Sequence, residues 1–283
     1  MPNTLFADRK KAITYCFANQ KGGVGKTTLA IQFAYYCSLV LRKKTLIIDL
    51  DGQGNATRSI LEKDDEGQPC YDLLTDEAQS KQFFVKGNKV AMNPIKCPWD
   101  VDLIGSLPND AELIDVTRMN IADVLIAPRR VKDLKPKYDV IIVDCPPTNS
   151  TILFAALSMA DYVIAPIGLG YAIDGLNGIA QSCYDVQLYR EKKTPFMLGA
   201  VFNRVRRLSE AKDILDEIKA SMPDMVFETT LSDRPGVESA SYTGTPIWRQ
   251  RYNHVAATEI SKFCAEIIEK TKVVEETIMK GDD

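Results

Sequence analysis

Short apolar runs alternate with amphipathic segments along most of the chain, and this alternation predicts the order of strands and helices. Mostly apolar runs occupy residues 12–18, 45–50, 101–107, 138–143, 162–166 and 195–202. Runs of this length with little polar alternation are typical of strands that are covered on both faces. The pattern therefore predicts an α/β fold with a mostly parallel, twisted sheet and helices on both faces.

Segments between these runs carry apolar residues at three- and four-residue intervals, which predicts helices. The clearest are residues 26–41, 149–160, 176–191 and 254–279, and another helix is expected to begin near Ala111. We expect residues 254–279 to pack against the sheet. The region 62–93 is polar and poorly periodic, apart from a short helix expected over 70–74. Residues 92–98 contain two prolines and are expected to form a surface loop.

The segment between the first apolar run and the first helix is rich in glycine and reads NQKGGVGKTT over residues 19–28. A strand, a glycine loop and a helix in this order present backbone N–H groups and a helix N-terminus to a phosphate. Lys26 is placed to reach the β- and γ-phosphates, and the Thr27 hydroxyl to bind Mg²⁺. The candidate nucleotide-binding residues of this loop are Gly22, Gly23, Val24, Gly25, Lys26, Thr27 and Thr28.

The loop departs from the ordinary phosphate-binding spacing, because Gln20 stands where a glycine is usual and a second lysine, Lys21, begins the loop. It therefore resembles the KGGxGK[ST] signature of the ParA/MinD family of deviant Walker-A P-loop ATPases, and it is most similar to the Soj-like ParA partition ATPases. The resemblance implies ATP and Mg²⁺ as cofactors and a homodimer in the ATP state. It also implies that Lys21 reaches the nucleotide of the partner chain. A chance glycine and lysine loop is the alternative.

Asp49 and Asp51 lie two positions apart at the end of the second apolar run. This spacing points two strand side chains to the same side, at the sheet edge where α/β proteins bind their ligands. The stretch IIDLDGQGNAT resembles the family signature DxDPQ, with Gly52 in place of the proline. The resemblance implies that Asp49 helps to hold the magnesium and its water, and that Asp51 orients the attacking water. Two aspartates that only cap a turn are the alternative.

Asp144 directly follows the apolar run 138–143 and is followed by Cys145, Pro146 and Pro147. An acid at the end of a central strand lies beside the phosphate loop, where it can hold magnesium through water. The segment resembles the D-x-P-P element of the same family, and helix capping is the alternative role. The metal candidates are thus Thr27, Asp49 and Asp144, and the catalytic candidates are Lys21, Lys26 and Asp51.

Arginines are concentrated after the run 195–202, which ends at Asn203. The resemblance implies that Asn203 reads the adenine edge, although asparagine is also common in turns. It further implies that arginines on one face bind DNA phosphates without reading sequence. Residues 231–247 resemble the family's strand-loop-helix segment, but the family's usual arginines do not align residue for residue, and an ordinary solvated surface is the alternative. The candidate DNA contacts are Arg204, Arg206, Arg207, Arg234, Arg249 and Arg251.

Composition limits the possible functions only loosely. A formal net charge of −3 argues against a wholly basic nucleic-acid coat protein but does not exclude a local basic patch. The seven cysteines include no C-x-x-C pair, and no apolar stretch is long enough to cross a bilayer. We expect a cytoplasmic, nucleoid-associated protein with reduced thiols. Residues 1–11 are expected to be a short lead-in without room for a DNA-binding domain, and residues 12–283 a single P-loop ATPase domain.

Together these patterns predict a ParA-like Mg-ATPase that dimerises on ATP and binds nonspecific DNA. A ParB-type partner would stimulate hydrolysis while the protein partitions or positions a cargo. One alternative is a MinD-like membrane-cycling ATPase, but the mixed and partly acidic tail predicts no stable membrane binding. A nucleotide-gated scaffold with negligible turnover is a second candidate. A nitrogenase-reductase-like enzyme is a third, and it requires cluster-binding cysteines.

Overall fold

A seven-stranded sheet organises the chain, of which the computed structural model describes residues 5–6, 9–87, 90–206, 208–251 and 253–281. The strand order is β3-β4-β2-β5-β1-β6-β7, and all neighbours are parallel except β3 and β4. The predicted mostly parallel α/β sheet is confirmed. The strands are β1 (Ile13–Phe17), β2 (Thr45–Asp49), β3 (Ile95–Cys97), β4 (Val101–Ile104), β5 (Val140–Asp144), β6 (Tyr162–Ile167) and β7 (Phe196–Phe202).

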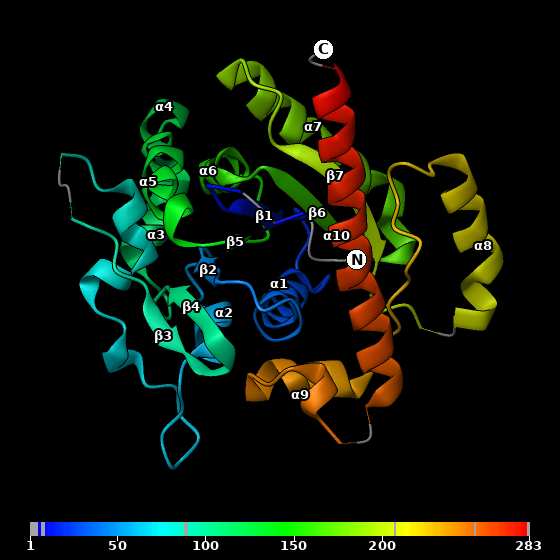
Figure 1. Cartoon of the computed structure of the whole chain (residues 1–283), viewed down its shortest axis with the longest axis horizontal. Coiled ribbons are helices and arrows are strands. Elements are labelled where there is room, and N and C mark those ends of the chain that lie inside the picture. The colour runs from blue at the N-terminus through cyan, green and yellow to red at the C-terminus, as the bar shows by residue number, and fades with distance from the viewer. Residues whose placement is uncertain (1–4, 7–8, 88–89, 207, 252, 282–283) are drawn as a thin grey trace.

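Helices cover both faces of this sheet (Figure 1). One face packs against α1 (Lys26–Tyr35), α2 (Asn55–Ile60), α9 (Pro235–Thr243) and α10 (His254–Gly281). The other face packs against α3 (Ala111–Asp115), α4 (Ile121–Val124), α5 (Ile126–Leu134), α6 (Thr151–Met159), α7 (Ala172–Arg190) and α8 (Leu208–Ser221). Residues Tyr36–Val40 continue α1 as a π-helix, and short 3-10 turns include Tyr71–Leu73, Asp76–Ala78, Ser80–Phe84 and Lys135–Lys137.

Alternating side chains of the buried strands supply two separate cores. In β1, Cys16 joins the core under α6 and α7, whereas Tyr15 and Phe17 join the core under α1 and α10. The Tyr15 and Phe33 rings meet edge to face with centroids 5.1 Å apart, and the Tyr15 hydroxyl donates to Thr271 of α10. The expected docking of the C-terminal helix on the sheet is therefore confirmed.

The prediction for residues 92–98 was wrong, because Ile95–Cys97 forms the antiparallel edge strand β3. The chain reverses through Trp99 and Asp100, both of which have a left-handed backbone conformation. A strand of three residues gives too little periodicity to be recognised. The helices α4, α5 and α8 were also not predicted. The strand expected at the start of residues 231–247 is reduced to a bridge between Val205 and Ser232.

Candidate nucleotide-binding site

The glycine-rich loop lies between β1 and α1, and hydrogen bonds from Asn19 hold its start. The Asn19 carboxamide oxygen accepts from the Lys21 backbone N–H at 2.9 Å, and its amide nitrogen donates to the Pro166 carbonyl at 2.7 Å. Gly23 and Gly25 have φ values of 74° and 91°, which disfavour any residue with a Cβ. The ends of β1 and β6 thus fix the loop in the curved conformation that the glycines permit.

Lys26 and Asn203 close onto the backbone of this loop. The buried Lys26 ammonium donates to the Lys21 carbonyl at 3.0 Å, and the Asn203 amide donates to the Val24 carbonyl at 2.8 Å. A methyl group on Gly25 would overlap the Asn203 amide nitrogen. Asn203 therefore braces the loop in this conformation, and its adenine contact stays a prediction.

The three candidate acids converge at the carboxyl ends of neighbouring strands. Asp49 and Asp144 are register partners on β2 and β5, and Asp51 follows two positions after Asp49. Asp49 accepts hydrogen bonds from the Thr57 backbone N–H, the Thr57 hydroxyl and the Asp51 N–H. Burial is the main cause that raises the pKa of Asp49 to about 7, and the nearby charge of Asp51 adds to it.

Asp144 differs from Asp49, because both of its buried carboxyl oxygens lack a hydrogen-bond donor among the described residues. Burial first and the charge of Asp49 second raise the pKa of Asp144 well above its usual value, whereas the neighbouring Thr27 hydroxyl and the charge of Lys26 oppose this rise only in part. A buried carboxylate without a partner is costly unless a cation or a donor compensates it. Asp144 beside Thr27 is therefore suited to a cation.

These residues could supply some of the ligands of a Mg²⁺ ion, and the nucleotide phosphates and water would supply the others. Among the described residues, no three His, Cys, Asp or Glu side chains form a complete metal cluster. Magnesium commonly uses one or two protein ligands together with phosphate oxygens and water. The Thr27 hydroxyl and the Asp144 carboxylate would hold it in that way, with Asp49 more fully occupied by Thr57.

A cavity of about 390 Å³ lies over the loop. Gly23, Gly25, Lys26, Thr27 and Thr28 line it from the loop. Three residues named in the sequence analysis, Asp51, Pro147 and Arg204, also line the cavity. The other lining residues were not identified from sequence, and they are Asn55, Arg58, Ser59, Ser241 and Tyr242. Five of the seven predicted loop residues and Asp51 thus line one cavity, whereas Gly22 and Val24 do not line it.

The residues that were missed come from two elements. Arg58 and Thr57 belong to α2, which begins after Gly54, and Gly54 has a left-handed φ of 66°. Gly54, directly before Asn55, is the one sequence signal that marks the start of this helix. Ser241 of α9 donates to the Thr28 hydroxyl across 213 positions of sequence, which no local pattern reveals.

The predicted DNA-binding arginines do not form one exposed cluster. Arg204 pairs with Glu238 at 2.7 Å and contacts the Gly23 carbonyl at 3.4 Å, so it belongs to the nucleotide cavity. Arg206 pairs with Asp233 at 2.8 Å. Arg234 pairs with Glu259 at 3.4 Å, Arg249 and Arg251 are exposed, and Arg207 lies outside the described residues.

The structure also bears on the nitrogenase-reductase-like alternative. Cys145 is buried, and its thiol donates to the Phe17 carbonyl, so it does not lie at an accessible edge where two chains share a cluster. None of the described helices combines the length and the apolar character that are needed to cross a membrane.

Comparisons with known proteins show the family of the chain. Residues 11–195 match the family model described as AAA domain. The chain is 30% identical to the chromosome-partitioning ATPase Soj of Treponema pallidum over 259 residues, which cover 90% of this chain and 96% of Soj. It is 30% identical to the sporulation initiation inhibitor protein Soj of Bacillus subtilis over 233 residues, or 81% and 87% of the two chains. The chain belongs to the ParA/Soj family of ATPases. The family inferred from the loop is therefore confirmed.

Solved structures show that the ParA/Soj fold extends over nearly the whole chain. The ATP complex of a Cyanothece McdA variant superposes with a TM-score of 0.73 at 18% identity, covering 91% of this chain and 96% of McdA. A putative plasmid partition protein from Borrelia burgdorferi bound to AMPPNP gives 0.71 at 21% identity, covering 93% and 100%. Cobyrinic acid a,c-diamide synthase from Mycobacterium smegmatis, with ADP and magnesium, gives 0.66 at 21% identity, covering 82% and 91%. At these identities the likeness concerns the fold alone.

Proposed function

We propose that this protein is a partition-type switch that binds Mg-ATP, pairs with a second copy, and in that state binds duplex DNA without sequence preference. The observation that carries the proposal is the combination of a cationic phosphate loop with an unpartnered buried carboxylate, Asp144, next to Thr27. A relative of similar length is named a chromosome-partitioning ATPase, which supports a partition role. A ParB-type protein would be the partner that stimulates hydrolysis.

The residues of the loop would act mainly by position and charge. Lys26 would exchange its contact with the Lys21 carbonyl for phosphate oxygens, and the loop N–H groups would bind the remaining phosphate charge. Bound Mg²⁺ would neutralise developing charge on the phosphates. Asp51 lines the cavity, where it would orient water toward the γ-phosphate. Lys21 is exposed at the start of the loop, where it would reach the nucleotide of a second copy.

The decisive experiment is co-sedimentation of the purified chain with nonspecific duplex DNA and, in parallel, with anionic liposomes. Each is tested without nucleotide, with ADP, with ATP and with a slowly hydrolysed ATP analogue. We expect ATP and the analogue, but not ADP, to bring the protein to DNA and not to liposomes. Binding to liposomes alone would favour membrane cycling, and binding to neither would reject the DNA role while leaving the ATPase assignment in place.

Turnover is measured on the same samples, because it separates a motor from a nucleotide-gated scaffold. Lys26→Ala is the matched negative control, since it removes the phosphate-binding ammonium. We expect slow ATP hydrolysis in the unmodified chain and none above background in this variant.

A further inference from the structure

The amino-terminal ends of the parallel strands carry a concentration of cations that the nucleotide site does not use. Lysines precede β1 (Lys10 and Lys11), β2 (Lys43 and Lys44), β5 (Lys135 and Lys137) and β7 (Lys192 and Lys193). Because the strands are parallel and in register, these positions lie along one edge of the sheet. The phosphate loop and the three acids lie at the opposite edge.

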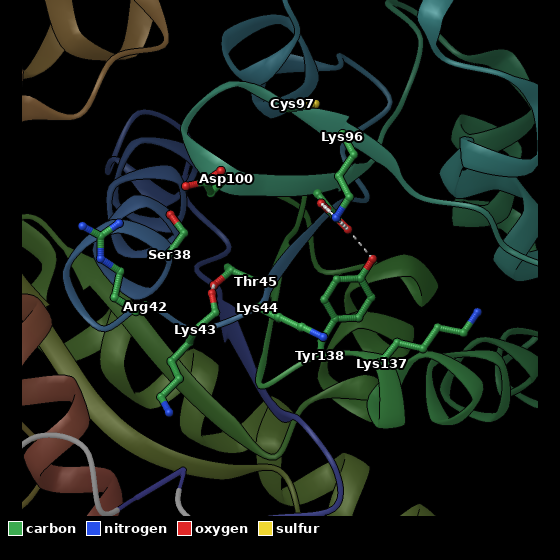
Figure 2. Close-up of a pocket in the computed structure, with 11 residues that line it drawn as sticks. Ser38, Arg42, Lys43, Lys44, Thr45, Lys96, Cys97, Asp100, Lys137 and Tyr138 are labelled. Atoms are coloured by element: carbon green, nitrogen blue, oxygen red, sulfur yellow. Dashed lines mark hydrogen bonds and ion pairs between the residues drawn. The ribbon is translucent and has the colours of Figure 1, made fainter.

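A cavity of about 600 Å³ lies at this edge, and residues of β2, β3 and β4 and the residues just before β5 line it (Figure 2). Five basic side chains line it, against the two carboxylates of Asp100 and Asp102. The basic residues are Arg42, Lys43, Lys44, Lys96 and Lys137. The lining therefore has an excess of positive charge on a chain whose formal net charge is −3.

Most of the positive charge here is not neutralised by ion pairs among the residues that the structure describes. Lys96 pairs with Asp102 at 2.8 Å, and Asp102 also accepts from the Tyr138 hydroxyl at 2.7 Å. Arg42, Lys44 and Lys137 are exposed, and their side chains form no ion pair with the residues that the structure describes. The other acids at this edge are engaged in part: Asp161 pairs with Lys135, Glu275 with Arg9, and Asp139 accepts from the Lys44 backbone N–H.

Like charges also crowd each other farther along the edge. The pKa of Lys192 is lowered, first by the charge of Arg190, then by desolvation and by Lys132. Mutual repulsion of this kind is relieved when an anionic partner binds. The positive charge along this edge therefore favours the binding of a polyanion.

The arrangement favours an extended ligand over a small one. Arg42, Lys43 and Lys137 point in different directions around the cavity and do not converge on one point (Figure 2). Tyr138 is the one aromatic residue among the described lining residues, and its hydroxyl is bound to Asp102, so the lining offers no stacking platform for unpaired bases. It also offers no large apolar anchor of the kind that protein interfaces use. Duplex phosphates are the polyanion that matches.

We propose that the amino-terminal edge of the sheet, centred on Arg42, Lys44 and Lys137, is the main contact surface for the phosphates of duplex DNA. The proposal rests on the DNA-binding function proposed above and assigns it to a surface. It places DNA on the side of the sheet opposite the nucleotide. Two chains that pair through their nucleotide edges would leave both basic edges exposed, and the dimer would gain affinity by binding with two sites.

The test is fluorescence anisotropy of a labelled nonspecific duplex with the full chain and a slowly hydrolysed ATP analogue over a range of salt concentrations. The triple variant Arg42→Gln/Lys44→Gln/Lys137→Gln removes the charge and keeps long polar side chains. We expect its affinity to fall at least about tenfold and its salt slope to shrink by about 2–3. Basal ATP hydrolysis without DNA should be unchanged, which verifies that the variant is folded.

Two further variants make the result specific. Arg42→Lys/Lys44→Arg/Lys137→Arg keeps the charge and should bind DNA as the unmodified chain does. Arg206→Gln/Arg249→Gln/Arg251→Gln removes the same charge from the arginines predicted by sequence, and it should lose less than about threefold.

The proposal is overturned if the edge variant binds like the unmodified chain while the arginine variant loses affinity, which leaves DNA binding in place on another surface. It is also overturned if the unmodified chain hydrolyses ATP but does not bind DNA, and in that case the proposed function fails with it. If the charge-keeping variant lost affinity for DNA, the shape of these side chains and not their charge would determine binding. That result would also overturn the proposal.

Discussion

Asp49 and Asp144 lie side by side at the carboxyl ends of β2 and β5, and both side chains are fully buried. Thr57 donates two hydrogen bonds to Asp49, whereas Asp144 receives none from the described residues. Two neighbouring carboxylates out of contact with water oppose each other's ionisation. The chain therefore carries an electrostatic cost at this position that a bound cation would relieve.

Asp144→Asn should stabilise the nucleotide-free chain. The folded pKa of Asp144 lies above its unfolded value, so the folded state binds more protons and loses stability as pH rises above about 4. Asparagine removes this penalty, and the gain in unfolding free energy should be about 1–3 kcal/mol at pH 8 and smaller at pH 5. Chemical denaturation at the two pH values measures it.

Asp72→Asn is the matched control for that measurement, because Asp72 is exposed. Its effect should be close to zero at both pH values. A variant at Asp144 that is less stable than the unmodified chain at pH 8 would contradict the electrostatic cost. ATP hydrolysis should be lost in Asp144→Asn, so stability and activity are expected to change in opposite directions.

Thr57→Val should destabilise the chain, because the Thr57 hydroxyl is held between two buried partners. It donates to Asp49 and accepts from the Ser106 backbone N–H, both at 2.8 Å. Valine has nearly the same shape, but it leaves the Ser106 N–H without its acceptor and removes one of the three hydrogen bonds to Asp49, at a cost of about 1–3 kcal/mol. Thr57→Ser keeps the hydroxyl and should cost less than Thr57→Val. If the two variants were equally stable in urea unfolding, loss of the hydroxyl would cost no more than loss of the methyl group, which would contradict the prediction.

Much of the fold was predictable because buried parallel strands leave a strong sequence pattern. The apolar runs 45–50 and 138–143 were recognised with bounds close to those of β2 and β5. The phosphate loop was recognised because its chemistry is contained in ten consecutive residues. By contrast, β3 is too short to show a period, and α4 and α5 divide an amphipathic stretch into pieces.

The parts of the site that were missed depend on contacts between distant segments. Ser241 reaches Thr28, and Asn203 braces Val24 across 179 positions. The partners of the arginines could not be predicted for a related reason. Sequence counts Arg204 and Arg206 as free cations, but folding brings Asp233 and Glu238 to them. The cations of the basic edge were overlooked, because they come from separate strands and become neighbours only in the sheet.

The glycine at position 52, which replaces the proline of the family signature, is explained by packing. A Cβ on Gly52 would approach the Ile114 Cγ1 atom to 2.8 Å, closer than two carbon atoms tolerate. Gly52→Ala should therefore cost about 1–3 kcal/mol. In the background of Ile114→Ala the same change should cost little, because the clashing atom is gone. Additive effects in this double-mutant cycle would show that the contact is not the cause.

Mixing two inactive variants tests whether Lys21 acts on the nucleotide of the partner chain. Lys21→Ala leaves the Lys21 carbonyl that Lys26 contacts, so ATP binding should survive while turnover falls about 100-fold. Asp51→Asn should be inactive through loss of water orientation. In a mixed dimer, however, the Lys21→Ala chain keeps Asp51 and receives Lys21 from its partner, which completes one site.

An equimolar mixture of these variants should recover about a quarter of the unmodified turnover, because half of the dimers are mixed and each has one complete site. The control is an equimolar mixture of Lys21→Ala/Asp51→Asn with the unmodified chain, whose mixed dimers contain no complete site if the lysine crosses between chains. Only the dimers of two unmodified chains would then be active, which also gives about a quarter of the turnover. If Lys21 serves the nucleotide of its own chain, the single variants stay inactive when mixed. Every unmodified chain in the control then remains active, and its turnover is about half.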